Sequence, residues 1–265
     1  IIIIDNYKFE YVYNKFREKS NLPNIKYIRI DDIAYRKMSN NPHTTIIPNL
    51  VSKGQEKIIK QFIDNNYQIK YGREYIINEP KMVISENERL DILNLRKNRI
   101  QNKKTELNLM ISFGGTITNK ICALEAERLT ALIKLLKSNF SEIKINVIGD
   151  YGASIANKAN IKYNYINWLQ PLDLINLYKK SDLYIGSIGY SMWERVVQLL
   201  PSIVMPISQN QKEYLQVGID LNIHKDISII NENIIEDIDN MIDSCFSQKT
   251  AISGYNNVFK SLYEK

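Results

Sequence analysis

The stretch LNLMISFGGT, which runs from Leu107 to Thr116, decides the fold. Its strand portion, Leu107 to Phe113, is mostly apolar, as is typical of a strand covered on both faces in a parallel sheet. Gly114 and Gly115 end this strand, and from Asn119 to Leu136 apolar side chains recur with the 3.6-residue period of a helix. A buried strand, a glycine turn and an amphipathic helix in this order predict a βα unit.

The same alternation continues toward the C-terminus. Strands are predicted at Lys144 to Ile148, Ile161 to Tyr165, Leu183 to Ile185 and Ile203 to Pro206, with Gly149 to Gly152 as a turn. Helices are predicted at Pro171 to Lys180, Met192 to Leu199, Gln211 to Leu221 and Asn231 to Phe246. Short connections between alternating strands and helices predict a doubly wound parallel sheet. Ligands of such sheets bind outside the carboxyl ends of the strands, so the turns at those ends are candidate binding residues.

The first part of the chain shows a similar order. Strands are predicted at Ile1 to Tyr7, Ile25 to Ile30 and Thr44 to Leu50, and helices at Glu10 to Lys19, Lys53 to Asn65 and Asn87 to Lys104. We place a linker at Ile100 to Glu106 and therefore expect two domains, residues 1–104 and residues 105–265.

The composition is that of a folded protein, with 44% hydrophobic and 24% charged residues. No apolar run approaches the ~18 residues that a membrane span requires, so we expect a cytoplasmic protein without one. The net charge is +6, but the basic residues are interspersed among 29 acidic ones, and no nucleic-acid partner is expected. With two cysteines far apart and two histidines, no metal site is expected. The sequence indicates no oligomeric state.

Three glycine-bearing or polar turns follow predicted strands. At Gly114, Gly115 and Thr116 the backbone N–H groups and the positive end of the next helix suit a phosphate, although a tight turn that avoids a clash would use the same residues. In the turn Ser187 to Glu194, Gly189 and Ser191 could face phosphates while the carboxylate of Glu194 accepts hydrogen bonds from a ribose diol. The alternative for Glu194 is an acid that interacts with the helix dipole.

The third turn offers the amides of Asn210 and Gln211 to a sugar or a pyrophosphate, although amides at a helix start also serve as ordinary caps. Three such strand ends in one βα domain converge on one crevice, which favours a ligand site. In the first domain, Tyr7 ends a buried strand, and its hydroxyl could reach a ligand across an interdomain cleft. A core or capping role for Tyr7 is the alternative.

Together these residues resemble the nucleotide-sugar hydrolases of pseudaminic acid biosynthesis, the UDP-2,4-diacetamido-2,4,6-trideoxy-β-L-altropyranose hydrolase family. The matching segments are Ile2 to Tyr7, Ile30 to Asp32, Gly72 with Tyr75, Ile111 to Thr116, Ser187 to Glu194 and Gln209 to Gln211. The resemblance implies a GT-B-like α/β fold with two Rossmann-like domains, the N-terminal one on the sugar and catalytic side and incomplete here, the C-terminal one binding the nucleotide.

The resemblance also implies the roles of single residues. Tyr7 would be the substrate-binding or catalytic tyrosine, Glu194 the ribose ligand, and Gly115, Gly189, Tyr190 and Ser191 would lie along the diphosphate. The expected ligand is a UDP-sugar with an activated deoxy-diacetamido sugar of nonulosonic acid biosynthesis; UDP is the product, and no cofactor or metal is expected.

The family carries a glycine-rich loop with a catalytic histidine ahead of the strand on which this sequence opens, and nothing here matches it. We therefore expect a truncated chain that binds UDP without full turnover. A GT-B glycosyltransferase with a UDP-sugar donor and a non-catalytic nucleotide-sugar-binding module are the alternatives.

Overall fold

The computed structural model describes residues 2–5, 15, 27–30, 44–65, 68–78, 80–102, 106–113, 119–208 and 211–248; for residues 2–5, 27, 80 and 119–122 it describes the backbone alone. The chain divides into two compact units: the first comprises Ile1–Asn78 and Thr250–Lys265, and the second comprises Glu79–Lys249. Each unit has its own parallel sheet.

The sheet of the second unit has six strands in the order β10-β9-β8-β5-β6-β7, all parallel. Its strands are β5 (Glu106–Ser112), β6 (Glu142–Ile148), β7 (Asn164–Ile166), β8 (Leu183–Ser187), β9 (Ser202–Met205) and β10 (His224–Asp226). The helices between them are α4 (Asn119–Lys137), α5 (Gly149–Lys158), α6 (Pro171–Lys180), α7 (Met192–Val197) and α8 (Gln211–Asp220); η3 (Ile227–Ile229) and α9 (Ile234–Ser247) follow β10. Strand order and alternation confirm the doubly wound fold predicted from the sequence.

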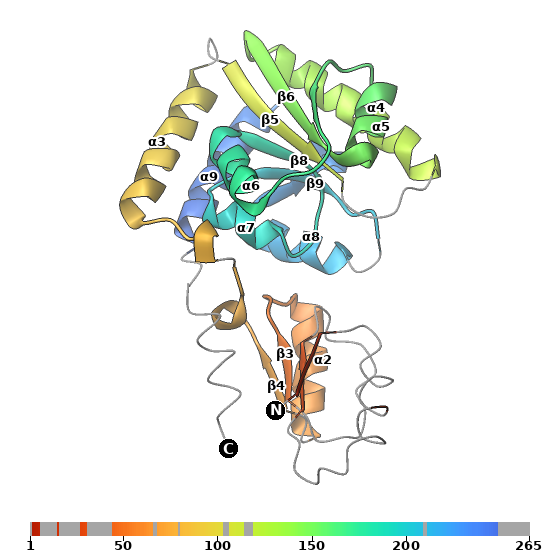
Figure 1. Ribbon diagram of the computed structural model, residues 1–265, viewed down its shortest axis with the longest axis vertical. Helices are drawn as coiled ribbons and strands as arrows, with labels where there is room; N and C mark the ends of the chain where they lie inside the picture. The colour runs from red at the N-terminus through yellow and green to blue at the C-terminus, as the bar shows by residue number, and fades with distance from the viewer. Residues whose placement is uncertain are drawn as a thin grey trace. The chain divides into compact units, whose positions relative to one another are not determined.

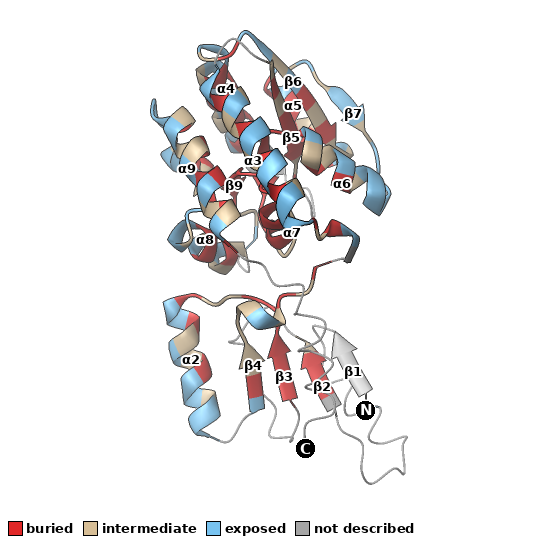
Figure 2. Ribbon diagram, turned by 90° about the vertical axis from the view of Figure 1, so that its left-hand side faces the viewer, coloured by how far each residue is buried: buried red, intermediate tan, exposed pale blue. Residues whose placement is uncertain are grey.

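The core of this unit forms where apolar side chains of the sheet meet the helices. Buried residues of β5, β6, β8 and β9 pack with those of α4, α5 and α9 in one cluster. The central strands are buried, whereas the edge strand β7 is largely exposed, as Figure 2 shows. Strand β8 is buried at all its residues, as expected of a central strand in a parallel sheet.

Helix α3 (Glu86–Gln101) runs beside α9 in the second unit (Figure 1). Two buried arginines explain its position. Arg89 donates hydrogen bonds to the carbonyl oxygens of Val197, Cys245 and Phe246, and Arg96 donates to those of Tyr178, Ser181 and Gln198. These carbonyls lie at the ends of α6, α7 and α9, where a cation also complements the helix dipole.

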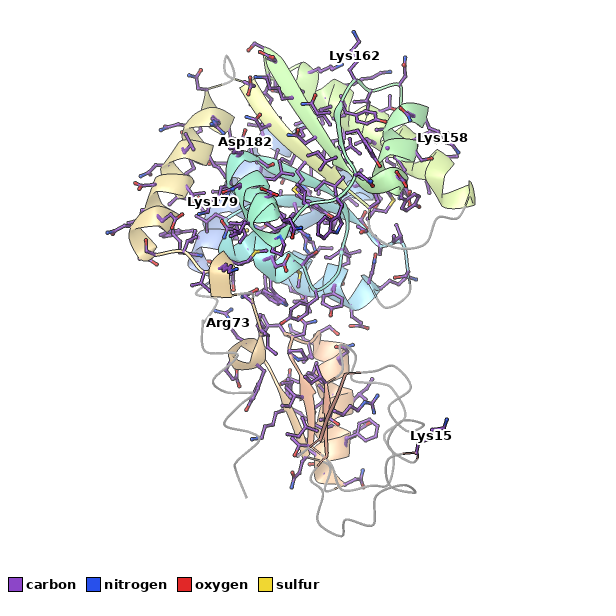
Figure 3. The ribbon with its side chains drawn as sticks, in the orientation of Figure 1. Lys15, Arg73, Lys158, Lys162, Lys179 and Asp182 are labelled. Carbon is purple, nitrogen blue, oxygen red and sulfur yellow. The ribbon has the colours of Figure 1, made fainter. Side chains whose placement is uncertain are left out.

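Further ion pairs attach α3 to the same unit. Lys179 pairs with Glu88 at 2.5 Å, and the buried carboxylate of Asp182 pairs with Arg99 at 3.0 Å. In Figure 3 the labelled Lys179 and Asp182 lie on the side of the sheet where α3 runs. The domain boundary predicted at residues 104 and 105 would leave α3 in the first domain. The structure divides the units ahead of α3, because the buried contacts of this helix are with the second unit.

The first unit has a four-stranded parallel sheet in the order β1-β2-β3-β4. Its described elements are β1 (Ile2–Asp5), β2 (Tyr27–Ile30), β3 (Thr44–Ile47), α2 (Lys53–Asp64), β4 (Gln68–Tyr71) and η1 (Arg73–Tyr75); η2 (Pro80–Met82) follows at the start of the second unit. Ile47, Ile59 and Ile69 form a buried cluster that joins α2 to the sheet. The predicted strands and the helix at Lys53 are confirmed, and the helix predicted at Glu10 to Lys19 lies almost wholly outside the described residues.

One α-helix and one strand of the second unit were not predicted. The expected turn at Gly149 is the beginning of α5, whose Tyr151, Ile155 and Ala156 are buried. Gly149 has a φ of 76°, so the glycine marks the entry into the helix rather than a connection between strands. The short strand β10 was missed as well, because only its first residue, His224, is buried.

Candidate functional site

The candidate site lies at the carboxyl ends of β5 and β8, neighbouring strands at the centre of the six-stranded sheet. The chain leaves β5 toward β6 on one side and leaves β8 toward β9 on the other, so the direction of winding reverses between them. In open α/β sheets this reversal opens the crevice in which ligands bind.

A glycine allows the two strands to approach each other closely. A Cβ atom on Gly186 would lie 1.8 Å from the carbonyl oxygen of Ser112 and 2.8 Å from the hydroxyl of Tyr184. The Tyr184 hydroxyl itself donates to the carbonyl oxygens of Ser112 at 2.7 Å and Ser187 at 3.0 Å. Burial raises the pKa of Tyr184, so the hydroxyl stays protonated and ties the ends of both strands together.

The turn after β8 carries three of the predicted diphosphate residues. Gly189, Tyr190 and Ser191 are all partly exposed. A Cβ atom on Gly189 would meet nothing within 4 Å in the described structure, so open space borders the turn at that position. Ser191 precedes α7, and its hydroxyl oxygen accepts a hydrogen bond from Nη1 of Arg195 at 3.0 Å. The turn is therefore accessible at Gly189, and the hydrogen bond from the buried Arg195 to Ser191 fixes it on its inner side.

Glu194 follows in the first turn of α7 and is partly exposed. Its Oε2 atom lies 3.3 Å from the hydroxyl of Tyr178, which comes from α6 and donates this hydrogen bond. Burial is the main cause of a raised pKa of Tyr178, so this hydroxyl also remains a donor. A carboxylate held on one side in this way still has lone pairs for further donors, such as the hydroxyls of a ribose.

Gln211, one of the two predicted sugar ligands, begins α8 after β9, the strand next to β8. Its Oε1 atom accepts a hydrogen bond from the backbone N–H of Ile207 at 2.9 Å. The side-chain amide is thereby fixed at the carboxyl edge of the sheet, with its NH₂ group as the part that can donate to a ligand.

The structure thus brings Gly189, Tyr190, Ser191 and Glu194 together on one turn and its helix, with Gln211 beyond the next strand. The other predicted site residues, Tyr7, Gly114, Gly115, Thr116 and Asn210, lie outside the described residues.

Sequence reasoning missed an exposed tryptophan at the same edge of the sheet. Trp168 follows β7 and precedes α6, and its side chain is 69% exposed. Because α6 leads from this turn to β8, its first residues lie at the carboxyl edge as well. An exposed indole offers a large flat surface on which a planar ring can stack. The signal in the sequence was a tryptophan in a polar connection between a strand and a helix.

A pocket of about 430 Å³ opens near the carboxyl ends of β9 and β10. Leu124, Glu125, Arg128, Met205, Pro206, Ile207, Asp226 and Ser228 line it. The buried carboxylate of Glu125 accepts a hydrogen bond from Tyr151 at 2.9 Å, and burial raises its pKa. Pro206 and Ile207 belong to the third predicted turn, residues 206–211, and the other lining residues were not predicted as site residues.

Within the part of the chain that the structure describes, no three His, Cys, Asp or Glu side chains form a group that could hold a metal ion. None of the described helices combines the length and the apolar character needed to cross a membrane.

No known protein family and no curated protein sequence matches this chain. Solved structures do match. A Listeria monocytogenes protein assigned as a UDP-N-acetylglucosamine 2-epimerase superposes with a TM-score of 0.58 and 13% identity, over 99% of this chain and 73% of that one. S. aureus MnaA in complex with UDP gives a TM-score of 0.58 and 12% identity, over 99% and 74%.

The Acinetobacter baumannii MurG structure gives a TM-score of 0.52 and 14% identity, over 97% of this chain and 77% of that one. At these identities the likeness concerns the fold. It confirms the GT-B-like α/β architecture expected from the sequence, with parallel sheets in two Rossmann-like units.

Proposed function

We propose that this protein is an enzyme that binds a UDP-sugar and releases UDP by hydrolysis of the bond between the anomeric carbon and the diphosphate. The observation that carries the proposal is the arrangement at the β8–α7 turn: the carboxylate of Glu194, held by Tyr178, lies next to the open turn of Gly189, Tyr190 and Ser191 at the centre of the sheet.

The ribose and the diphosphate of a nucleotide each have a suitable partner in this arrangement, and an exposed tryptophan on the same carboxyl edge of the sheet is a candidate partner for the base. The carboxylate of Glu194 can accept hydrogen bonds from the two hydroxyls of a ribose, which are charge-assisted and therefore strong. The turn from Gly189 to Ser191 offers backbone N–H groups and a hydroxyl to the diphosphate. The indole of Trp168 offers a stacking surface for the base.

In the proposed reaction, the residues that bind the nucleotide have one main task, which is to hold the leaving group. Water attacks the anomeric carbon, the carbon–oxygen bond breaks, and the electron pair stays on the β-phosphate oxygen of UDP, while the attacking water loses one proton to the solvent. The described residues would bind UDP and orient it so that this oxygen departs as a stabilised anion. The fold supports the assignment of a UDP site, because S. aureus MnaA, which has a similar fold, was solved in complex with UDP.

Hydrolysis of an activated deoxy-diacetamido sugar in nonulosonic acid biosynthesis is the specific activity that we propose, following the sequence resemblance. Transfer of the sugar to an acceptor is the second candidate, favoured by the structural match to MurG. The two activities share a UDP site and differ in what attacks the anomeric carbon.

Incubation with a UDP-sugar in the absence of any acceptor separates these activities. A hydrolase releases UDP and free sugar in equal amounts, whereas a transferase releases UDP only when an acceptor is added. Tight binding of UDP with neither product, even in the full-length protein and with acceptors supplied, would instead support a non-catalytic binding module.

A further inference from the structure

A buried cation lies directly behind the β8–α7 turn. Arg195 is 1% exposed, and its guanidinium carbon lies 3.9 Å from the centroid of the Tyr184 ring. Its Nε donates to the hydroxyl of Ser202 at 3.0 Å, and its Nη1 donates to the hydroxyl of Ser191 at 3.0 Å. Three side chains therefore fix the guanidinium in one orientation.

In the described part of the chain no carboxylate forms an ion pair with this cation. Among the described residues Arg195 takes part in no ion pair, and its Nη2 atom is buried without a hydrogen-bond partner. Arg99, by contrast, pairs with the carboxylate of Asp182 at 3.0 Å, and the equally buried Arg96 donates to three carbonyl oxygens. A buried charge is costly unless a counter-charge is close to it, so the site favours the arrival of an anion.

The histidine and the tyrosines around Arg195 do not supply that charge. Burial lowers the pKa of His224 to about 4, with a further contribution from the charge of Arg195, so the imidazole is neutral near pH 7. The hydroxyls of Tyr178 and Tyr184 stay protonated because their pKa values are raised. The carboxylate of Glu194, the adjacent residue, accepts its hydrogen bond from Tyr178.

The contacts of Arg195 connect it to the exposed turn. Ser191 belongs to that turn, and the Tyr184 ring under the guanidinium carries the hydroxyl that binds the carbonyl oxygens of Ser112 and Ser187. Arg195 is thus part of the side-chain network that holds the carboxyl ends of β5 and β8 together, where the direction of winding reverses. Because it is buried, mobile salt ions screen its field only weakly.

We propose that Arg195 is the positioning residue that makes the site selective for a diphosphate-bearing ligand. The guanidinium orients the hydroxyl of Ser191, and its uncompensated charge favours the phosphate groups that bind along the turn. The inference rests on the proposed nucleotide site and assigns Arg195 no contact with the ligand.

The test compares the dissociation constants of UDP and uridine, measured by calorimetry, for the wild type, Arg195→Gln and Arg195→Lys. We expect Arg195→Gln to weaken UDP binding by about tenfold and uridine binding by less than about twofold, because only UDP carries the negative charge that the guanidinium favours. Arg195→Lys keeps the charge and should keep most of the preference for UDP, although it loses the planar fork.

A merely structural role would weaken UDP and uridine by the same factor, and that result would overturn the inference while leaving the nucleotide site in place. If Arg195→Gln does not fold by circular dichroism, the lysine variant decides: loss of the UDP preference with the charge retained would also contradict the inference. Failure of the wild type to bind either ligand would refute the proposed function itself, which is a distinct outcome.

Discussion

The hydroxyl of Tyr178 on α6 donates a hydrogen bond to the carboxylate of Glu194 on α7, with 3.3 Å between the oxygen atoms. Tyr178 is fixed at its other end as well, because its carbonyl oxygen accepts a hydrogen bond from Arg96 at 2.5 Å. The acid that we assign to the ribose is therefore oriented by a buried side chain rather than left to rotate.

Tyr178→Phe removes this hydroxyl and little else. We expect the variant to fold normally and to bind UDP about threefold to tenfold more weakly, as for loss of one hydrogen bond to a charged group. The preference for UDP over 2′-deoxy-UDP should shrink by the same factor, because the variant carboxylate is less well oriented toward the ribose. Competition titrations with the two nucleotides measure this, and an unchanged preference would show that Tyr178 does not position Glu194.

Gly186→Ala should lower the stability of the protein, whereas Gly189→Ala should weaken UDP binding. Gly186→Ala places a methyl group against the Ser112 carbonyl, so we expect the free energy of unfolding to fall by about 3 kcal/mol. Gly189→Ala enters open space, so it should leave stability nearly unchanged and weaken UDP binding where the methyl group meets the ligand. Chemical denaturation and UDP titration of both variants test this; normal UDP affinity in a folded Gly189→Ala would count against a ligand at the turn.

Trp168→Ala tests the stacking surface. The side chain is 69% exposed, so its removal should hardly change the melting temperature. We expect UDP affinity to fall by about tenfold, within the range measured for base–aromatic stacking. Leu172→Ala is the matched control, because it removes an exposed apolar side chain from the first turn of the following helix, α6. This variant should bind UDP normally. Equal effects of the two substitutions would argue against stacking.

We expect His224 to make the stability of the second unit dependent on pH. Its Nε2 lies 2.7 Å from the carbonyl oxygen of Leu215, and burial lowers its pKa from 6.5 to about 4. Because the folded-state pKa is depressed, the unfolded chain binds the proton first. The contribution of the neutral imidazole to the free energy of unfolding is complete above pH 6.5. It is lost as the pH falls toward 4, and the free energy of unfolding decreases by up to about 3 kcal/mol.

His224→Gln removes this titration and should flatten the decline of unfolding free energy between pH 6.5 and 4. Urea denaturation at several pH values measures the slope for both proteins. Parallel slopes would mean that His224 does not carry the effect. Gly218 is not a useful control, because a Cβ atom there would lie 1.7 Å from the His224 ring.

Periodicity was sufficient to predict the fold of the second unit. The buried strand at Leu107, the 3.6-residue period of α4 and the turn after β8 have simple patterns, and the structure follows them. Helix α5 escaped prediction because Gly149 and Gly152 suggested a turn, although Gly152 is buried with its Cβ position only 3.0 Å from Val147. The predicted domain boundary differs from the observed one because α3 has a polar sequence pattern, and such a pattern does not reveal the buried hydrogen bonds that Arg89 and Arg96 form with the second unit.

The candidate site was predictable only in part. Residues of a single turn, such as Gly189 and Glu194, are close in sequence and could be proposed together. The support of that turn comes from distant segments: Tyr178 from α6, Tyr184 from within β8 and Ser202 from β9. Such contacts depend on strand order and burial, and neither spacing nor composition indicates them.

The central claim, that Glu194 binds the ribose of UDP, is tested most directly by calorimetric titration of UDP into the wild type and Glu194→Ala. We predict clear binding by the wild type and a loss of about 1.5 to 3 kcal/mol, tenfold or more, in the variant. Glu142→Ala, which removes an exposed carboxylate at the opposite end of the sheet, should bind UDP like the wild type. Equal affinity of wild type and Glu194→Ala, or no binding by the folded wild type at millimolar UDP, would contradict the account.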